Sequence, residues 1–363
     1  MKILINVLRY RESAPAGGNK TYVYNLTPKL VEKYPEHDWI ILAAEDNENY
    51  FKMNAPGADI RSFRLHPRML FRIPKEHLIV RRALKEFNPD VYYNPATLLP
   101  FGKMKCASVV TIHDINFTHF SQGYWHDRYK WRLYSHTCES ADRIMADSRF
   151  TADDLAAKFP VCKGKVEVVY AGVSEDFFQQ NFTHEELKGI RQKYHLPDRY
   201  ILSIGHFPHK NVSGLMRVFA GLNPDISGEC SLVVTGIPDS DKIRYQREAA
   251  ALEISEKVIL LEYLTKKDFR GLLKSARVFA FPSLFEGFGL PVLEAMASGC
   301  PVIASDRTSI PEVAGDAGIV CDPDDIVKFR NELSKLLTDE NLRRDLIAKG
   351  MARAKEFNWG RTA

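Results

Sequence analysis

Short apolar runs rich in β-branched residues recur along the 363-residue chain and alternate with segments of helical pattern. Such runs are typical of strands buried on both faces, as in parallel sheets covered by helices. They lie at 2–7, 39–44, 90–94, 108–114, 143–148 and 166–170, and again at 200–205, 231–236, 258–263, 278–283, 301–305 and 318–323. This number of strands predicts an α/β protein with two doubly wound sheets, in a chain too long for one core.

Helix signals fill the intervals between these runs. Ser148 is a favoured N-cap residue at the start of the helical segment 148–159. Pro291 and Gly299 bracket another segment, at the positions that favour the first residue of a helix and the residue after its end. Further helices are expected at 21–34, 184–198 and 266–276.

The polar stretch 184–198 follows the first set of strands and leads to the second. We therefore expect one domain over 1–180 and another over 181–363. Ligands of open parallel sheets bind beyond the carboxyl ends of the strands, so the expected site is a cleft between two facing sheets.

Composition excludes several classes of protein. The net charge of +4 is too small to indicate a nucleic-acid binder, and the basic excess lies within the first 180 residues. No apolar run is long enough to span a membrane, and the first residues have the pattern of a strand rather than a signal sequence. Six cysteines without CxxC or zinc-finger spacing predict free thiols, no structural metal and a cytoplasmic location.

The segment 283–305 carries the sharpest chemical pattern. Glu286 and Glu294 are separated by seven residues, and between them a glycine-rich turn (287–289) leads to a helix that opens at Pro291. Backbone N–H groups at a helix N-terminus suit an anion, and carboxylates suit hydroxyl groups. A ligand with phosphates, a ribose and a sugar would satisfy both the helix N-terminus and the carboxylates. The simpler interpretation is that one glutamate caps the helix and the other is solvated.

This segment resembles the EX7E motif of the retaining GT-B glycosyltransferases, in particular family 4, and most of all bacterial polysaccharide mannosyltransferases and rhamnosyltransferases. The resemblance extends over nearly the whole chain, through Gly17–Gly18, His113–Asp114, GVSEDFF at 172–178 and Lys210–Asn211. It implies two Rossmann-like domains facing each other across a cleft, an N-terminal one for the acceptor and a C-terminal one for the nucleotide-sugar. A last helix that crosses back to the N-terminal domain is part of the same expectation.

The resemblance also assigns roles to residues. Glu294 would hold the ribose hydroxyls and Glu286 the transferred sugar, while the backbone of 288–290 would contact sugar and phosphates. The resemblance implies that His113, Lys210 and Glu286 are catalytic. It implies a donor-binding set of Gly17, Gly18, His206, Lys210, Tyr263, Leu264, Glu286, Phe288, Gly289, Leu290 and Glu294.

Lys210 stands just beyond a strand that ends at Gly205, where a positive charge would stabilise a departing diphosphate; a solvated loop lysine is the alternative. Family members usually carry an Arg or Thr after that glycine and a basic residue beside the lysine. Here the neighbours are His206 and His209. The second positive charge would come from either histidine or from neither.

Retention is expected through front-face attack, with double displacement through a carboxylate as the other route. No cofactor or metal is expected, because the Asp239–Asp241 pair has the context of a solvated helix start. GDP-mannose is the favoured donor, and UDP-glucose, UDP-GlcNAc and dTDP-rhamnose also fit. A sugar-nucleotide epimerase and a non-catalytic sugar-nucleotide-binding module are the alternatives, and the absence of GxGxxG disfavours a dehydrogenase.

The acceptor is expected to be a glycan or a lipid-linked sugar, and nucleic acid is not expected as a partner. The aromatic side chains of Phe117, Phe120, Tyr124 and Trp125 follow His113 closely enough to line an acceptor site. The stretch 61–85 holds eight Lys and Arg against one acidic residue, with apolar residues interleaved. This composition allows contact with an anionic membrane surface or acceptor, or an ordinary solvated helix face.

Overall fold

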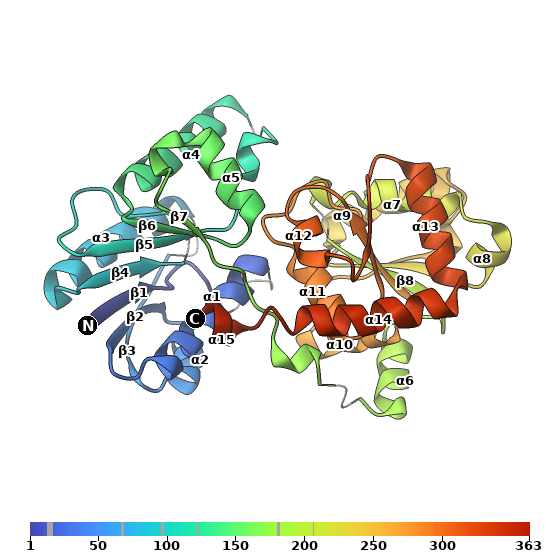
Figure 1. Cartoon of the computed structure of the whole chain (residues 1–363), viewed down its shortest axis with the longest axis horizontal. Helices are drawn as coiled ribbons and strands as arrows, with labels where there is room; N and C mark the ends of the chain where they lie inside the picture. The colour runs from blue at the N-terminus through green and yellow to red at the C-terminus, as the bar shows by residue number, and fades with distance from the viewer. Residues whose placement is uncertain (13–16, 67–68, 96–97, 122, 180–181, 206) are drawn as a thin grey trace. The chain divides into compact units, whose positions relative to one another are not determined.

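The computed structural model describes residues 1–12, 17–66, 69–95, 98–121, 123–179, 182–205 and 207–363. The described chain forms two compact units. The first comprises Met1–Gly172 together with Trp359–Ala363, and the second comprises Val173–Asn358. Each unit is a parallel sheet with helices packed on it, which confirms the predicted α/β class and the prediction of two sheets (Figure 1).

The first unit contains a seven-stranded sheet in the order β3-β2-β1-β4-β5-β6-β7 among its described residues, with every pair parallel. The strands are β1 (Lys2–Asn6), β2 (Asp38–Ala44), β3 (Ala58–Phe63), β4 (Val91–Asn94), β5 (Ala107–Ile112), β6 (Arg143–Ala146) and β7 (Val166–Val168). The apolar runs did not predict β3. It is an edge strand with exposed Asp59 and Arg61, so it lacks the continuous apolar run of a central strand.

The helices of the first unit are α1 (Gly18–Lys33), α2 (Glu48–Asn54), α3 (Met69–Phe87), α4 (Tyr124–Ser140), α5 (Arg149–Lys158) and α15 (Trp359–Thr362), with short 3-10 turns η1 (Asn116–Thr118) and η2 (Pro160–Cys162). Apolar residues of α3, α4 and α5 form one core with the sheet. The predicted N-cap of α5 is confirmed, because the Ser148 hydroxyl accepts a hydrogen bond from the Thr151 N–H at 3.0 Å.

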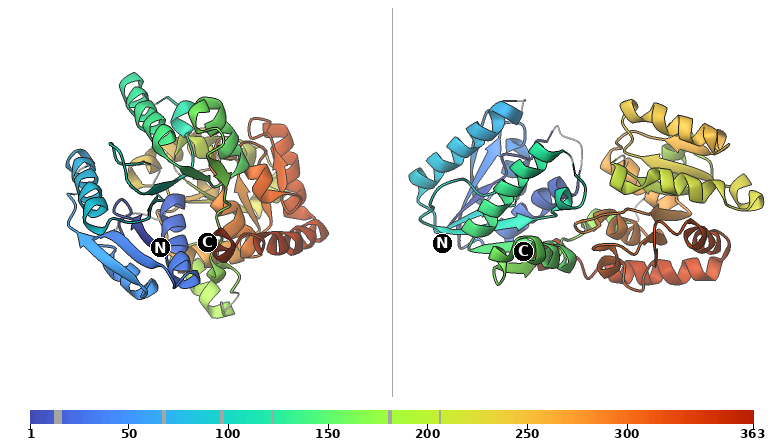
Figure 2. Two further views of the ribbon diagram at one scale, coloured as in Figure 1. Left: turned by 60° about the vertical axis from the view of Figure 1, so that its left-hand side comes forward. Right: turned by 90° about the horizontal axis from the view of Figure 1, so that it is seen from above.

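The second unit contains a six-stranded parallel sheet in the order β10-β9-β8-β11-β12-β13 among its described residues. The strands are β8 (Tyr200–Ile204), β9 (Ser231–Thr235), β10 (Val258–Leu260), β11 (Val278–Phe281), β12 (Val302–Ser305) and β13 (Ile319–Cys321). Figure 2 shows the helices lying along both sides of this sheet. The strand order reverses between β8 and β11, because β9 and β10 lie on one side of β8 and β11 to β13 lie on the other. Such a switch point is where open α/β sheets bind ligands.

The helices of the second unit are α6 (His184–Lys193), α7 (Val212–Ala220), α8 (Pro224–Gly228), α9 (Asp239–Ala251), α10 (Lys266–Ser275), α11 (Leu290–Ala297), α12 (Ile310–Ala314), α13 (Ile326–Thr338) and α14 (Glu340–Ala354), with 3-10 turns η3 (Glu175–Phe177), η4 (Pro208–Lys210) and η5 (Ser255–Lys257). Residues of α7, α9, α13 and α14 form one core with the strands. Asp239 and Asp241 lie in the first turn of α9, so the interpretation of this pair as a helix start is confirmed.

The division between the units falls at Gly172–Val173, before the boundary expected at 180. The Val173 N–H donates to the carbonyl oxygen of Phe357 at 2.9 Å, so residue 173 is tied to the second unit. The last residues pack with the first unit: α15 lies against α1, and the Lys33 ammonium donates to the Gly360 carbonyl oxygen at 2.9 Å.

None of the helices in the described residues has both the length and the hydropathy that a membrane span requires. The six cysteines are free thiols, of which Cys106 is half-buried and the others are buried.

Candidate active site

A largely buried ion pair lies at the switch point of the second sheet. Lys210 ends the short turn η4 after β8, and Glu286 lies in the loop after β11. The Lys210 Nζ and a Glu286 carboxylate oxygen are 2.6 Å apart, and the two side chains are 16% and 11% exposed. The ammonium also lies 5.1 Å from the ring centre of Phe281, the last residue of β11. Two residues predicted to be catalytic, 76 positions apart, are therefore in direct contact.

Gly205 allows the lysine to lie here. Its φ angle is +111°, a conformation that residues with a Cβ rarely adopt, and a Cβ at this position would lie 2.6 Å from Lys210 Cγ. The lysine side chain therefore lies directly over the glycine backbone at the end of β8. A side chain at position 205 would force the ammonium away from Glu286.

The loop that carries Glu286 is held by two residues that sequence reasoning did not single out. Thr308 accepts a hydrogen bond from the Glu286 N–H at 3.1 Å, and the Ser309 hydroxyl donates to the carbonyl oxygens of Glu286 and Phe288 at 3.0 and 2.8 Å. Thr308 has a φ of +59°, which is rare for a β-branched residue. Backbone strain of this kind is concentrated at functional sites, but no sequence pattern marks it.

The glycine-rich turn leads into α11 as predicted. Gly289 is the N-cap of α11 with a φ of +104°, and Pro291 lies in the first turn. Phe288 and Leu290 are buried, so their backbone rather than their side chains would meet a ligand. Pro291 has no N–H, and the Val292 N–H donates to the Gly289 carbonyl oxygen at 3.0 Å, so the first turn of α11 offers a ligand mainly the positive end of the helix dipole.

Glu294 lies one turn further along α11 and is half-buried. Burial raises its pKa to about 8, and the nearby Lys266 opposes this only in part. Lys266 has other partners, because its ammonium contacts the Asp176 carboxylate at 2.6 Å and the Ser174 hydroxyl at 3.2 Å. The Glu294 carboxyl is thus desolvated and weakly compensated, a state typical of side chains poised for a ligand.

The remaining predicted donor residues of this unit surround the same strand ends. Tyr263 and Leu264 follow β10, and the Tyr263 ring is exposed and would lie 3.8 Å from a Cβ placed at Gly236. His209 holds the 282–289 loop through its backbone, since its carbonyl oxygen accepts from the Leu284 N–H at 2.6 Å and from the Ser283 hydroxyl at 3.1 Å. His206 lies outside the described residues.

His113 belongs to the first unit and follows β5. Its side chain is 4% exposed, with Nδ1 2.6 Å from an Asp147 carboxylate oxygen and Nε2 3.0 Å from the Pro95 carbonyl oxygen. Burial opposes the charged ring, but Asp147 and the Pro95 carbonyl outweigh it and raise the pKa of His113. Both neighbours are acceptors, so an imidazolium that donates from both nitrogens fits this environment.

Gly17 and Gly18 form the N-cap and first residue of α1 in the same unit, and both are exposed. A Cβ at Gly17 would meet nothing within 4 Å, so there is open space where a ligand was predicted. The rest of the preceding loop, 13–16, lies outside the described residues.

The aromatic residues suggested for an acceptor site differ in exposure. Phe117 is buried in the core, where its ring lies 4.8 Å from that of Tyr134, so its inclusion was wrong. Phe120, Tyr124 and Trp125 are exposed.

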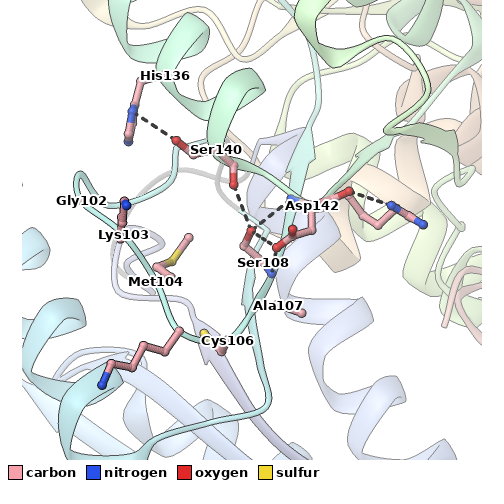
Figure 3. A pocket seen from close by; sticks show the side chains of 11 residues that line it. Gly102, Lys103, Met104, Cys106, Ala107, Ser108, His136, Ser140 and Asp142 are labelled. Atoms are coloured by element: carbon pink, nitrogen blue, oxygen red, sulfur yellow. Dashed lines mark hydrogen bonds between the residues drawn. The ribbon is translucent and has the colours of Figure 1, made fainter.

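A hollow of about 890 Å³ lies at the amino end of β5. Figure 3 shows that its polar side chains bond to one another: the Asp142 carboxylate accepts from the N–H and the hydroxyl of Ser108, both at 2.8 Å. Because parallel sheets bind ligands at the carboxyl ends of their strands, this hollow is not our candidate site.

Comparisons with known proteins identify the family and the fold. Residues 188–353 match the family model of glycosyl transferases group 1, and residues 16–177 match that of glycosyltransferase family 4. A curated relative, O-antigen chain mannosyltransferase B of Escherichia coli, is 31% identical over 76% of this chain and 73% of its own length. The chain belongs to glycosyltransferase family 4.

Solved structures show the fold of this glycosyltransferase. Sucrose-phosphate synthase of Thermosynechococcus elongatus superposes with a TM-score of 0.78 at 17% identity, covering 99% of this chain and 95% of that one. HepE of Anabaena, solved in complex with UDP-glucose, has a TM-score of 0.75 at 17% identity, covering 99% and 96%. Both likenesses identify the GT-B fold expected from the sequence.

The two matched regions divide the predicted residues of the glycosyltransferase. Lys210, Glu286 and Glu294 lie in the region of group 1, and the Gly17–Gly18 turn and His113 lie in that of family 4. The structure brings Lys210 and Glu286 into contact within one unit, close to the start of α11.

Proposed function

We propose that this chain is a retaining hexosyltransferase that moves mannose from GDP-mannose to a glycan or lipid-linked acceptor during polysaccharide or lipopolysaccharide synthesis. The contact between Lys210 and Glu286, beside the first turn of α11, carries the proposal. It combines a cation for a diphosphate, a carboxylate for sugar hydroxyls and the positive end of a helix dipole for phosphate oxygens. The name of the Escherichia coli relative supports mannose as the sugar.

The proposed reaction is a front-face displacement. The bond between the anomeric carbon and the diphosphate oxygen breaks, and its electron pair leaves with the nucleoside diphosphate. The acceptor oxygen bonds to the anomeric carbon on the same face, and its proton passes to the departing phosphate oxygen. Lys210 and the N-terminus of α11 stabilise the leaving charge, so no metal is required in this proposal.

Glu294 would accept hydrogen bonds from the ribose hydroxyls, which fits a carboxyl group that is desolvated and has little compensation. Glu286 would orient the transferred sugar and keep the Lys210 ammonium in place before the donor binds. The proposed contact of His113 with the sugar would need Nε2 to exchange the Pro95 carbonyl for a sugar hydroxyl.

We place the protein in the cytoplasm, with contact to the inner face of the membrane through the segment 61–85. Exposed basic side chains on α3, such as Lys75, Arg82 and Lys85, support this contact. Anionic lipids attract such side chains at close range.

A nucleotide-sugar panel tests the proposal. The full-length protein is mixed with GDP-mannose, UDP-glucose, UDP-GlcNAc or dTDP-rhamnose, and thermal shift and slow donor hydrolysis are measured with and without EDTA. We expect GDP-mannose to stabilise the wild type and to be hydrolysed in the presence of EDTA. Glu294→Ala should lose both effects, whereas Glu256→Ala, a change at an exposed glutamate of the same unit, should keep them.

The outcomes separate the alternatives. A response to a different donor would show that another sugar is transferred. No response to any donor in folded protein would overturn the transferase proposal in favour of a non-catalytic module. Interconversion of one nucleotide-sugar into another would identify an epimerase. The anomeric proton coupling of a transferred product, measured by NMR, tests retention.

A further inference from the structure

Thr308 has a strained backbone in the turn between β12 and α12. Its φ of +59° lies in the left-handed region, which β-branched residues rarely adopt. Ser309 follows with an ordinary φ of −81° and is the N-cap of α12. Backbone strain of this kind persists only where the surrounding structure fixes the chain, so the contacts around Thr308 must hold it there.

The turn is anchored on both sides of Thr308. On one side, the Arg307 guanidinium donates to the carboxylates of Asp322 and Asp324 at 2.7 and 2.6 Å, in the loop after β13. On the other side, Ile310 is the first residue of α12 and is fully buried. The two anchors leave residue 308 little freedom to relax into a more favourable conformation.

The turn holds both backbone polar groups of Glu286. The Glu286 N–H donates to the Thr308 hydroxyl oxygen at 3.1 Å, and the Ser309 hydroxyl donates to the Glu286 carbonyl oxygen at 3.0 Å. Ser309 is fully buried. Because the N–H and the C=O of Glu286 are both fixed, the direction in which its side chain leaves the backbone is fixed as well. The carboxylate then lies 2.6 Å from the Lys210 ammonium.

Threonine is a poor choice for a turn that only connects β12 to α12, because glycine adopts a positive φ without strain. What threonine adds over glycine at position 308 is a hydroxyl group, and that group bonds to Glu286. Within the described residues, none of the other non-glycine residues with positive φ is β-branched: they are Asn88, His195, Asn211 and Glu253. The strain at Thr308 therefore accompanies a hydrogen bond to the loop of the candidate site.

We propose that Thr308 is a positioning residue for glycosyl transfer, which holds Glu286 in the orientation that meets the transferred sugar. The inference rests on the proposed function, which assigns Glu286 to the sugar and Glu294 to the ribose. Loss of the Thr308 hydroxyl should then weaken recognition of the sugar and leave recognition of the nucleotide unaltered. A purely structural role would change both or neither.

Thr308→Gly in the full-length protein separates positioning from stability. The relieved strain offsets the lost hydrogen bond, so the midpoint temperature of unfolding should stay within about 3 °C of the wild type. Hydrogen exchange at the Glu286 amide, resolved to single residues by mass spectrometry, should become about tenfold faster, because its N–H loses the Thr308 acceptor. This measurement requires no donor.

The functional measurements compare GDP with GDP-mannose by isothermal titration calorimetry. Thr308→Gly should bind GDP within about twofold of the wild type and GDP-mannose about tenfold more weakly. Hydrolysis at saturating GDP-mannose should slow by about tenfold or more, because a small misplacement at the reacting centre costs up to about 100-fold in rate. If the panel identifies another donor, that donor and its free nucleoside diphosphate replace this pair.

Three variants serve as controls. Thr308→Ser keeps the hydroxyl and should keep both the exchange protection and most of the sugar affinity. Glu253→Gly changes an exposed residue with the same φ of +59° in the turn after α9, and should alter neither. Adding Thr308→Gly to Glu286→Ala should cause no further loss of sugar affinity, because Thr308 acts through the Glu286 side chain.

Two results would overturn the inference. One is that the Glu286 amide exchanges at the wild-type rate in Thr308→Gly. The other is that Thr308→Gly binds GDP-mannose as the wild type does, or loses affinity for GDP and GDP-mannose equally, which would leave Thr308 a structural role alone. Failure of the proposed function has a different signature: the wild type itself would bind none of the nucleotide-sugars, and both proposals would fall.

Discussion

Removal of either member of the Lys210–Glu286 pair should destabilise the second unit strongly. At 2.6 Å and an effective dielectric constant of about 20, two unit charges attract by roughly 6 kcal/mol. The cost of burying both charges offsets much of this attraction, so the net contribution of the pair is small. A single substitution leaves the other charge buried without its partner, which costs about 3–5 kcal/mol.

A double-mutant cycle measures this coupling. We expect Lys210→Met and Glu286→Gln each to lower the free energy of unfolding by about 3 kcal/mol or more. The double variant should lose no more than either single variant, which corresponds to a coupling energy of about 3 kcal/mol. In a unit of this size, the midpoint temperature should fall by roughly 6–12 °C in each single variant.

The placement of the tryptophans gives an assay for each unit. The four tryptophans, Trp39, Trp125, Trp131 and Trp359, all lie in the first unit. Tryptophan fluorescence therefore follows the first unit, and far-UV circular dichroism follows both. The substitutions at Lys210 and Glu286 should lower the midpoint temperature of the unfolding transition that circular dichroism detects and tryptophan fluorescence does not.

Lys335→Met provides the control, because its partner Glu332 forms an exposed pair with it on the surface of the same unit. Its effect should be below about 1 kcal/mol. Single-variant effects below about 1 kcal/mol, or two single effects that simply add in the double variant, would refute the reasoning.

Three further predictions concern single residues. Because the pKa of Glu294 is raised from 4.5 to about 8, the protonated carboxyl stabilises the folded state. This contribution is present in full below pH 4.5 and is lost as pH rises to about 8. In urea unfolding, the free energy of unfolding of Glu294→Gln should therefore rise relative to that of the wild type between pH 4.5 and about 8, and the difference should stay constant above pH 8. A difference that does not change with pH would contradict the prediction. His113→Ala leaves Asp147 buried without its partner, so tryptophan fluorescence should report a loss of about 3–5 kcal/mol, largely restored by adding Asp147→Asn. Because the pKa of His113 is raised, its contribution to the stability of the folded state is present in full below the ordinary pKa near 6.5. This contribution is lost as pH rises through the raised pKa. Gly205→Ala should cost about 1–3 kcal/mol because of its positive φ and the crowding of the lysine side chain, and should weaken donor binding, whereas Gly228→Ala, with nothing within 4 Å, should be nearly neutral.

Much of the fold can be predicted from the sequence because central parallel strands are buried on both faces and are visible as apolar runs. The exception, β3, is an edge strand with exposed charged residues, and its pattern merges with the basic stretch that follows. The glycine turn and the start of α11 could also be predicted from the sequence, because a positive φ and the first helical turn favour particular residue types.

The candidate site was only partly readable. The spacing of Glu286 and Glu294 is local, so the sequence by itself determined that both stand around one turn and one helix. The contact of Glu286 with Lys210 depends on β8 and β11 being neighbours in the sheet, although β9 and β10 lie between them in the chain.

The positions of Thr308 and Glu76 also depended on tertiary structure. Thr308 meets the Glu286 N–H because β12 lies beside β11, and its polar side chain alone gives no sign of this. The pattern of the stretch 61–85 does not show that Glu76 is buried, yet it lies on the side of α3 that packs toward β1 and β4. Periodicity and turn chemistry act between neighbours in sequence, whereas strand order and helix packing decide which distant side chains meet, and only the folded chain contains that information.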